Sequence, residues 1–267
     1  FKRQYISVAG SPGEDMKYKV VMDVGRYGDD NRLTAFLKKA QADYTTNYGK
    51  ISLGLIGMNT YGVQEENWGY RFISKSAIDK NKFSATADLG IGYSNTLMEN
   101  LNLSLQLTNG EGYKKSQEDT YHKFSLNATY GEMKINKNDG YNAGLVFSTM
   151  PTENDPINMI SVFGGYATNN LRLGAEYDKQ TSGDLEETII SVTSNYRALD
   201  NLDAYVRYDM YTDNVENDMN GENYLIAGLL LNCGNGLSLA PNVRMTSFED
   251  SDMDNELEYK LNFQFTC

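Results

Sequence analysis

The chain has 267 residues and a formal net charge of −12, and its longest purely aliphatic run is the seven-residue segment 225–231. A transmembrane helix needs about 20 apolar residues, so this run is too short to span a bilayer. The acidic balance leaves no basic patch to neutralise phosphates, which argues against a nucleic-acid partner.

Alternation of apolar and polar side chains recurs along the whole chain and predicts β-strands. The final strand is the longest clear case, with large apolar residues at every second position from Leu257 to Phe265. The predicted strands cover residues 1–10, 16–27, 33–46, 51–60, 83–94, 101–108, 123–130, 141–149, 157–167, 171–178, 189–198, 202–211, 224–233, 237–248 and 256–266.

Two features of these strands favour a membrane barrel over a soluble β-sandwich. Several strands alternate over the roughly 9–11 residues that a tilted strand needs to cross a bilayer. The connections alternate between short turns, such as 47–50 and 234–236, and long polar loops. Short periplasmic turns and long extracellular loops are typical of outer-membrane barrels. The fold class is therefore all-β, a transmembrane antiparallel barrel formed by residues 1–267 as one domain.

Strand parity predicts that the intact barrel contains about sixteen strands. If the last strand runs towards the periplasm, the first predicted strand runs the same way. A barrel with both ends periplasmic needs an even number of strands, so one further strand is expected before Phe1. A barrel of that size encloses an aqueous channel.

Three stretches resemble bacterial outer-membrane porins of the sixteen-stranded type related to phosphate-selective porins. These are GLIGMNTYGVQEENWGYRF (54–72), SATADLGIG (84–92) and NGEGY (109–113), with FKRQYISV (1–8) and MDVGR (22–26) placed where that family has its second and third strands. The resemblance is strongest over residues 33–150. It implies a trimeric diffusive channel in the outer membrane of a Gram-negative-type bacterium. Such porins usually end on Phe, whereas this chain ends on Cys267.

The connection 61–82 contains the only tryptophan, Trp68. By the same resemblance, it folds into the lumen as a constriction, where Arg71 and Lys75, with Lys80 and Lys82, would favour anions. Glu65, Glu66 and Asp79 would instead favour cations. The alternative is an ordinary surface loop in which Trp68 and Tyr70 pack on the barrel rim.

Alternation places a set of charged side chains on the lumen face of the predicted strands. They form either transverse ladders that orient a permeating dipole or neutralised cross-strand pairs, and the sequence leaves both open. A denser arginine ladder is expected of a phosphate-specific channel. The set consists of Lys39, Asp43, Asp88, Arg172, Glu176, Arg197, Arg207, Asp209, Arg244, Glu258 and Lys260.

The two cysteines, Cys233 and Cys267, are both expected at the periplasmic rim. Their strands are two apart, about 10 Å by strand spacing, whereas a disulfide joins Cα atoms about 4.4–6.8 Å apart. They form either a disulfide across a bent turn or two free thiols. The acidic segment 216–221 fails the EF-hand frame because Ala227 stands where a bidentate Glu is required. Loose Ca²⁺ binding between acidic loops is the remaining metal hypothesis.

The predicted function is passive diffusion of small hydrophilic solutes or ions through a water-filled lumen, without a cofactor. Its partners are outer-membrane lipids and, by resemblance, two further copies of the chain. The alternative is a plugged structural or ligand-binding barrel within an envelope complex. An enzyme is not expected, because a lipolytic barrel needs a His beside a Ser nucleophile and the only histidine, His122, borders a loop.

Overall fold

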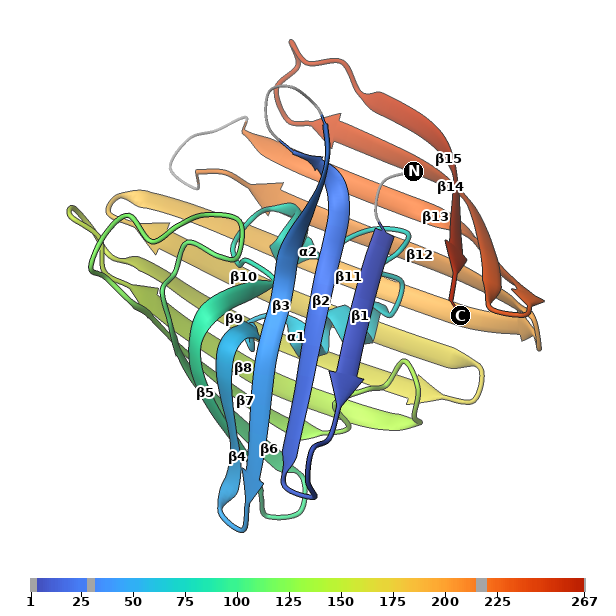
Figure 1. Cartoon of the computed structure of the whole chain (residues 1–267). Coiled ribbons are helices and arrows are strands. Elements are labelled where there is room, and N and C mark those ends of the chain that lie inside the picture. Colours follow the sequence, from blue (N-terminus) through green and yellow to red (C-terminus); the bar gives the residue numbers. More distant parts are fainter. Residues whose placement is uncertain (1–3, 28–31, 215–219, 267) are drawn as a thin grey trace.

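The computed structural model describes residues 4–27, 32–214 and 220–266 and contains one antiparallel sheet and two short helices (Figure 1). Each strand pairs with the next along the chain, so the sheet order is β1 to β15. The predicted all-β fold is confirmed. The strands are β1 (Gln4–Gly10), β2 (Met16–Tyr27), β3 (Arg32–Thr46), β4 (Gly49–Gly57), β5 (Ala87–Leu97), β6 (Leu101–Thr108), β7 (Lys123–Gly131), β8 (Gly140–Met150), β9 (Ile157–Thr168), β10 (Leu171–Ser182), β11 (Leu185–Leu199), β12 (Leu202–Thr212), β13 (Gly221–Gly234), β14 (Leu237–Phe248) and β15 (Glu256–Phe265).

The sequence prediction was wrong at the two ends of the connection between β4 and β5. Residues 58–60 and 83–86 were expected to be strand, but β4 ends at Gly57 and β5 begins at Ala87. The two ends lie against each other: the Met58 amide donates to the Thr86 carbonyl at 3.3 Å, and the hydroxyls of Thr60 and Ser84 are 2.5 Å apart. This contact closes the base of the connection and turns it out of the sheet.

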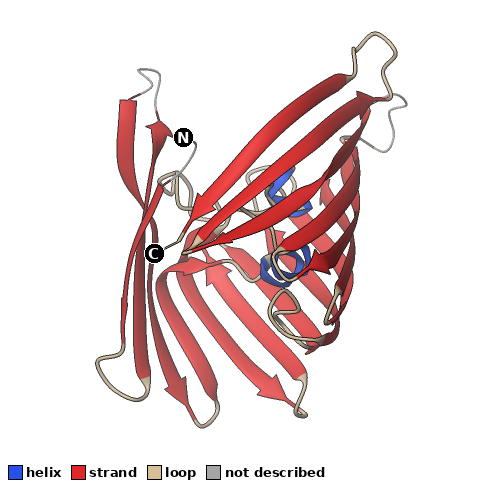
Figure 2. Cartoon of the chain, turned by 90° about the vertical axis from the view of Figure 1, so that its right-hand side faces the viewer, coloured by secondary structure: helices blue, strands red, loops and turns tan. Residues whose placement is uncertain are grey.

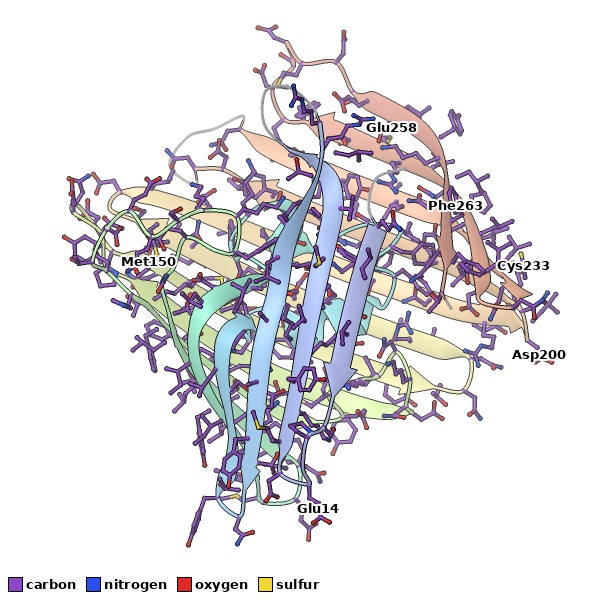
Figure 3. The ribbon with its side chains drawn as sticks, in the orientation of Figure 1. Glu14, Met150, Asp200, Cys233, Glu258 and Phe263 are labelled. Atoms are coloured by element: carbon purple, nitrogen blue, oxygen red, sulfur yellow. The ribbon has the colours of Figure 1, made fainter. Side chains whose placement is uncertain are left out.

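The two faces of the sheet differ as the period-two pattern requires. On β9, Met159 and Ser161 are buried on the inner face, whereas Ile160 and Val162 are about half exposed on the outer face. Figure 3 shows side chains projecting outward along the whole sheet. The outer face is therefore a continuous apolar surface. No helix in the described ranges is long and apolar enough to cross a membrane.

The sheet curls around the two helices, which lie on its inner side (Figure 2). In the described part of the chain β1 pairs only with β2, and β15 pairs only with β14. Because neighbouring strands are antiparallel, β1 and β15 run in the same direction and cannot close the barrel as an antiparallel pair.

The apolar core lies between the inner face of β8–β14 and the connection from β4 to β5. It consists of two clusters of buried side chains. The first contains Met58, Tyr61, Val63, Ala77, Ile78, Phe83, Val146, Met159, Phe163 and Ile189. The second contains Trp68, Tyr70, Ile73, Tyr205, Tyr224, Ile226 and Ala240.

We expect Val162→Arg to destabilise the folded protein in lipid by about 2–4 kcal/mol, because this outward side chain lies near the middle of β9, at the bilayer midplane. Thr168→Arg, at the end of the same strand and on the same face, should cost only about 0–1 kcal/mol. The measurement is urea unfolding in phospholipid vesicles, followed by heat-modifiable gel mobility. Equal costs at the two positions would contradict a lipid-facing outer surface.

Candidate functional site

Residues 58–86, called the inserted loop below, fold onto the inner face of the sheet. They contain α1 (Gly62–Trp68) and α2 (Ala77–Lys80). Helix α1 lies against β9, β10 and β11, and α2 lies against β11. The loop therefore follows one side of the lumen, as the constriction hypothesis expected, and does not lie on the outer surface.

Trp68 anchors the inserted loop to the wall. Its side chain is 2% exposed and packs edge-on against Tyr70 and against Tyr205 of β12, with ring centroids 5.5 and 5.8 Å apart. The indole nitrogen donates to the Ser74 carbonyl at 2.9 Å. A buried aromatic ring with its polar atom satisfied holds a segment in place through a large contact area.

Three arginines of the wall, called the wall arginines below, donate to backbone carbonyls of the inserted loop. Arg172 of β10 donates to the Trp68 carbonyl at 3.1 Å, and Arg244 of β14 donates to the Ile73 carbonyl at 2.7 Å. Arg207 of β12 donates to the Lys75 carbonyl. Irregular backbone inside a barrel leaves such carbonyls without secondary-structure partners. The wall arginines satisfy them.

A glycine allows one of these contacts. Gly69 ends α1 in the left-handed conformation, with φ of 75°. A Cβ added there would lie 2.5 Å from Nη2 of Arg172, the nitrogen that reaches the Trp68 carbonyl. The close approach of the guanidinium therefore requires glycine both for its backbone angle and for space.

Arg207 and Asp209 were predicted to line the pore, and the structure corrects this. Both side chains are 1% exposed, beneath the loop. The Asp209 carboxylate accepts from Nε and Nη2 of Arg207 at 2.7 and 2.5 Å and from the Ser191 hydroxyl at 2.7 Å. Glu176 lies behind the loop too, beside a small cavity that Arg207 also lines. These charges support the loop and do not contact the open lumen.

The inserted loop carries its own network of charges. Arg71 contacts Glu65 at 2.5 Å and Asp79 at 2.6 Å, and Lys75 contacts Asp79 at 3.0 Å. Burial raises the pKa of Glu65 despite the attraction of Arg71. Burial would also raise the pKa of Asp79, but Arg71 and Lys75 together hold it below its ordinary value. The predicted constriction residues Arg71 and Lys75 are thus brought together with the loop acids.

Four other predicted lumen residues lie away from this network. Asp88 is buried and accepts from the Gly110 amide at 2.5 Å, so it shapes the connection after β6. Arg197 lies 3.5 Å from Asp203 near the β11–β12 turn. On β15, Lys260 pairs with Glu258 at 2.5 Å. Of these contacts, only Arg197–Asp203 is a cross-strand pair of the kind that the sequence left open as an alternative to ladders.

The open part of the lumen lies between the inserted loop and the inner face of β3–β7. It is a cavity of about 720 Å³. Lys39 lines it, and Asp43 lies on the adjoining wall, where it accepts from Gln41 and Ser52. Glu66 of α1, which the sequence placed in the constriction, also lines it. The sequence did not point to the other two charged lining residues, Lys50 at the start of β4 and Lys134 in the connection after β7.

The remaining candidates carry no assembled site. Cys233 is a free, exposed thiol at the same end of the sheet as Asp200 (Figure 3), so the candidate disulfide is absent there, and Cys267 lies outside the described residues. Within the described ranges no group of three or more His, Cys, Asp or Glu could hold a metal ion. Residues 216–219 of the acidic segment lie outside those ranges, and loose Ca²⁺ binding stays a prediction. His122 is exposed, and its ring contacts the Thr120 carbonyl.

Comparison with solved structures places this architecture among outer-membrane channels. The chain is similar to Pseudomonas putida OprB (TM-score 0.77, 10% identity, 98% of this chain and 87% of that one) and to Salmonella typhi OmpF (0.72, 13%, 98% and 91%). It is also similar to an anion-selective porin from Comamonas acidovorans (0.66, 13%, 98% and 87%). The chain has the fold of an outer-membrane porin. No family model and no curated protein sequence matches it.

In this porin fold the single tryptophan reports directly on the inserted loop. We expect Asp79→Asn to weaken docking of the loop by about 3 kcal/mol, because it removes the carboxylate that Arg71 and Lys75 share. The emission of Trp68 should shift to longer wavelength as its ring becomes hydrated. An unchanged spectrum would contradict the anchoring role of this network.

The emission of Trp68 also tests how docking of the inserted loop depends on pH. The pKa of Asp79 in the docked loop lies below its ordinary value of 3.8. The stabilisation that the Asp79 carboxylate gives to loop docking is therefore present above that value and is lost as pH falls through the pKa of the docked state. The pKa of Glu65 is raised from 4.5. Protonation of Glu65 therefore stabilises loop docking, and this stabilisation is lost as pH rises. We therefore expect the acid-induced red shift of Trp68 to be smaller in Asp79→Asn and larger in Glu65→Gln.

Gly69→Ala should cost about 1–2 kcal/mol of loop docking from the left-handed backbone alone, and it should displace Arg172 from the Trp68 carbonyl. Gly62→Ala is the matched control, because an added Cβ at Gly62 meets nothing within 4 Å. Thermal melts followed by Trp68 emission should separate the two variants. Equal melting temperatures would show that the contact with Arg172 does not hold the loop.

Proposed function

We propose that the protein is a diffusion porin of a Gram-negative-type outer membrane, which lets small hydrophilic solutes or ions pass through its lumen. The cavity of about 720 Å³ beside the inserted loop is the observation that carries this proposal. The inserted loop narrows one side of the lumen, and the cavity leaves an open path on the other side, through which a solute can diffuse.

The lining of the cavity suits water and polar solutes. Amide and hydroxyl side chains from four strands and from the inserted loop face it: Gln41, Ser52, Asn59, Ser104, Gln106 and Asn127. Such groups exchange hydrogen bonds with a passing solute at little net change in free energy. Selectivity then depends on pore width and on charge.

Conduction requires a closed barrel, and we propose that closure uses a sixteenth strand between β1 and β15. Both edge strands run in the same direction, and one further strand, antiparallel to each, is the smallest addition that satisfies both edges. The structural neighbours support this proposal, since the chain spans 87% of the OprB chain and 91% of the OmpF chain. Assembly as a trimer is a further part of the proposal, supported by a trimer form of the similar Vibrio cholerae protein OmpT.

One observation favours the alternative of a plugged, ligand-binding barrel. The inserted loop is fixed by two apolar clusters and by the wall arginines, so it does not swing aside as a weakly held lid would. A closed barrel with this loop conducts only through the cavity beside it. Electrical measurement distinguishes the two functions.

The purified protein in a planar bilayer should give stable ohmic steps. Replacing residues 62–80 by a short Gly/Ser linker should raise the conductance of each step severalfold, because the narrowing element is removed. Asp79→Asn serves as a second variant that keeps the chain intact, and it should increase current noise. A folded, heat-modifiable protein without current would favour the plugged barrel.

A further inference from the structure

A β-bulge in β3 turns two consecutive lysines towards the lumen. Val21 of β2 pairs with Lys39, whereas the next residue, Met22, pairs with Leu37. Lys38 is therefore the extra residue of the bulge. Its ammonium donates to the Tyr5 hydroxyl at 2.9 Å and lies 4.3 Å from the centre of that ring. Bulges re-aim side chains next to functional sites.

Lysines of the neighbouring strands extend this feature into a cluster. Lys19 pairs across the sheet with Gln41, a cavity-lining residue. Lys50, at the start of β4, lines the cavity together with Lys39. The ammonium of Lys39 is within electrostatic range of the other three lysines. We call these residues the lysine cluster: Lys19, Lys38, Lys39 and Lys50.

The carboxylates near the lysine cluster are too few to neutralise it. Asp43 is the carboxylate near Lys39, and its Oδ1 already accepts from Gln41 and Ser52, at 2.5 Å each. Among the described residues, no ion pair joins a lysine of the cluster to a carboxylate. Like charges on adjacent strands destabilise a sheet, so folding stability does not account for this arrangement.

The cavity wall is accordingly positive. Three lysines and one glutamate line the cavity, a difference of 3 − 1 = +2, although the whole chain carries −12. Glu66 of α1 is the lining carboxylate, and its neighbour Glu65 is paired with Arg71. Glu65 is within electrostatic range of Lys38 but is already paired with Arg71, so the opposing wall neutralises the cluster only in part.

We propose that the lysine cluster recognises small oxyanions, with a carboxylate or phosphate as the charged group, and makes the channel anion-selective. This rests on the proposed diffusion function. The ammonium groups bind the oxyanion, and the amides and hydroxyls beside them accept and donate hydrogen bonds to the hydroxyls of a polyhydroxylated solute.

The acidic loops do not reverse this preference. The acidic segments 183–187 and 249–256 lie in and beside the connections 183–184 and 249–255, which are at the opposite end of the strands from the turns 47–48 and 98–100 near the cavity. Exposed charges are largely screened beyond a Debye length of about 8 Å at physiological salt. The field at the narrow part of the lumen is therefore set by the residues that line it.

The test is the reversal potential of the full-length protein in a planar bilayer across a KCl gradient. We expect chloride to permeate better than potassium, and gluconate or inorganic phosphate, but not glucose, to reduce the chloride current. Lys38→Gln/Lys39→Gln should lower the chloride-to-potassium permeability ratio by about threefold or more. Lys179→Gln is the matched control, because Lys179 pairs with Glu186 away from the cavity and should leave the ratio unchanged.

A second measurement keeps this test independent of conduction. Isothermal titration of the folded protein with gluconate should show saturable binding that Lys38→Gln/Lys39→Gln abolishes. A silent bilayer with this binding intact would overturn the diffusion function and leave the oxyanion site standing. Cation preference in the wild type, or a permeability ratio and binding that the double variant does not change, would overturn the oxyanion site.

Discussion

The lumen is shaped by the need of irregular backbone for hydrogen-bond partners inside a barrel. The loop backbone between and beside the two short helices is irregular, and the carbonyls of Trp68, Ile73 and Lys75 accept from side chains of the wall. Arginine suits this task because its guanidinium is always charged and presents several donors in a fixed plane. Arg207 reaches the loop with one nitrogen while two others hold Asp209, which neutralises its charge. The loop, the wall arginines and their carboxylates therefore form one unit.

This unit makes the two sides of the lumen different. The inner face of β8–β14 carries apolar side chains such as Val146, Phe163 and Ile226, which in a water-filled barrel would be exposed to solvent. They are buried because the loop covers them. The inner face of β3–β7 keeps polar groups, because there it faces the cavity. Burial of apolar surface thus decides where the loop lies, and the position of the loop decides where a solute passes.

The strands were predictable because period-two alternation is local and survives in a single sequence. The roles of the lumen charges were not, because alternation assigns a face but not what covers that face. Arg172, Arg207 and Arg244 all follow the inward pattern, yet each is occupied by the loop. The bulge at Lys38 shifts the register by one residue, and the only trace of it in the sequence is the consecutive pair Lys38–Lys39, where the period-two alternation is interrupted. Apolar residues at inward positions, such as Val146 and Ile226, were the available signal for a covered wall.

Net charge is a poor guide to the charge of the passage in such a barrel. Most of the acidic excess lies in connections, where carboxylates are hydrated and screened, and the carboxylates on the inner wall of β8–β14 lie beneath the loop. Asp209 belongs to the second group and accepts from Arg207 and Ser191. Glu176 belongs to it too and lines a small cavity beside Arg207. Lys39 and Lys50 remain at the open cavity, where a low-dielectric wall strengthens their field. The inserted loop therefore selects which charges a solute meets, by covering the acidic wall and leaving the lysines uncovered.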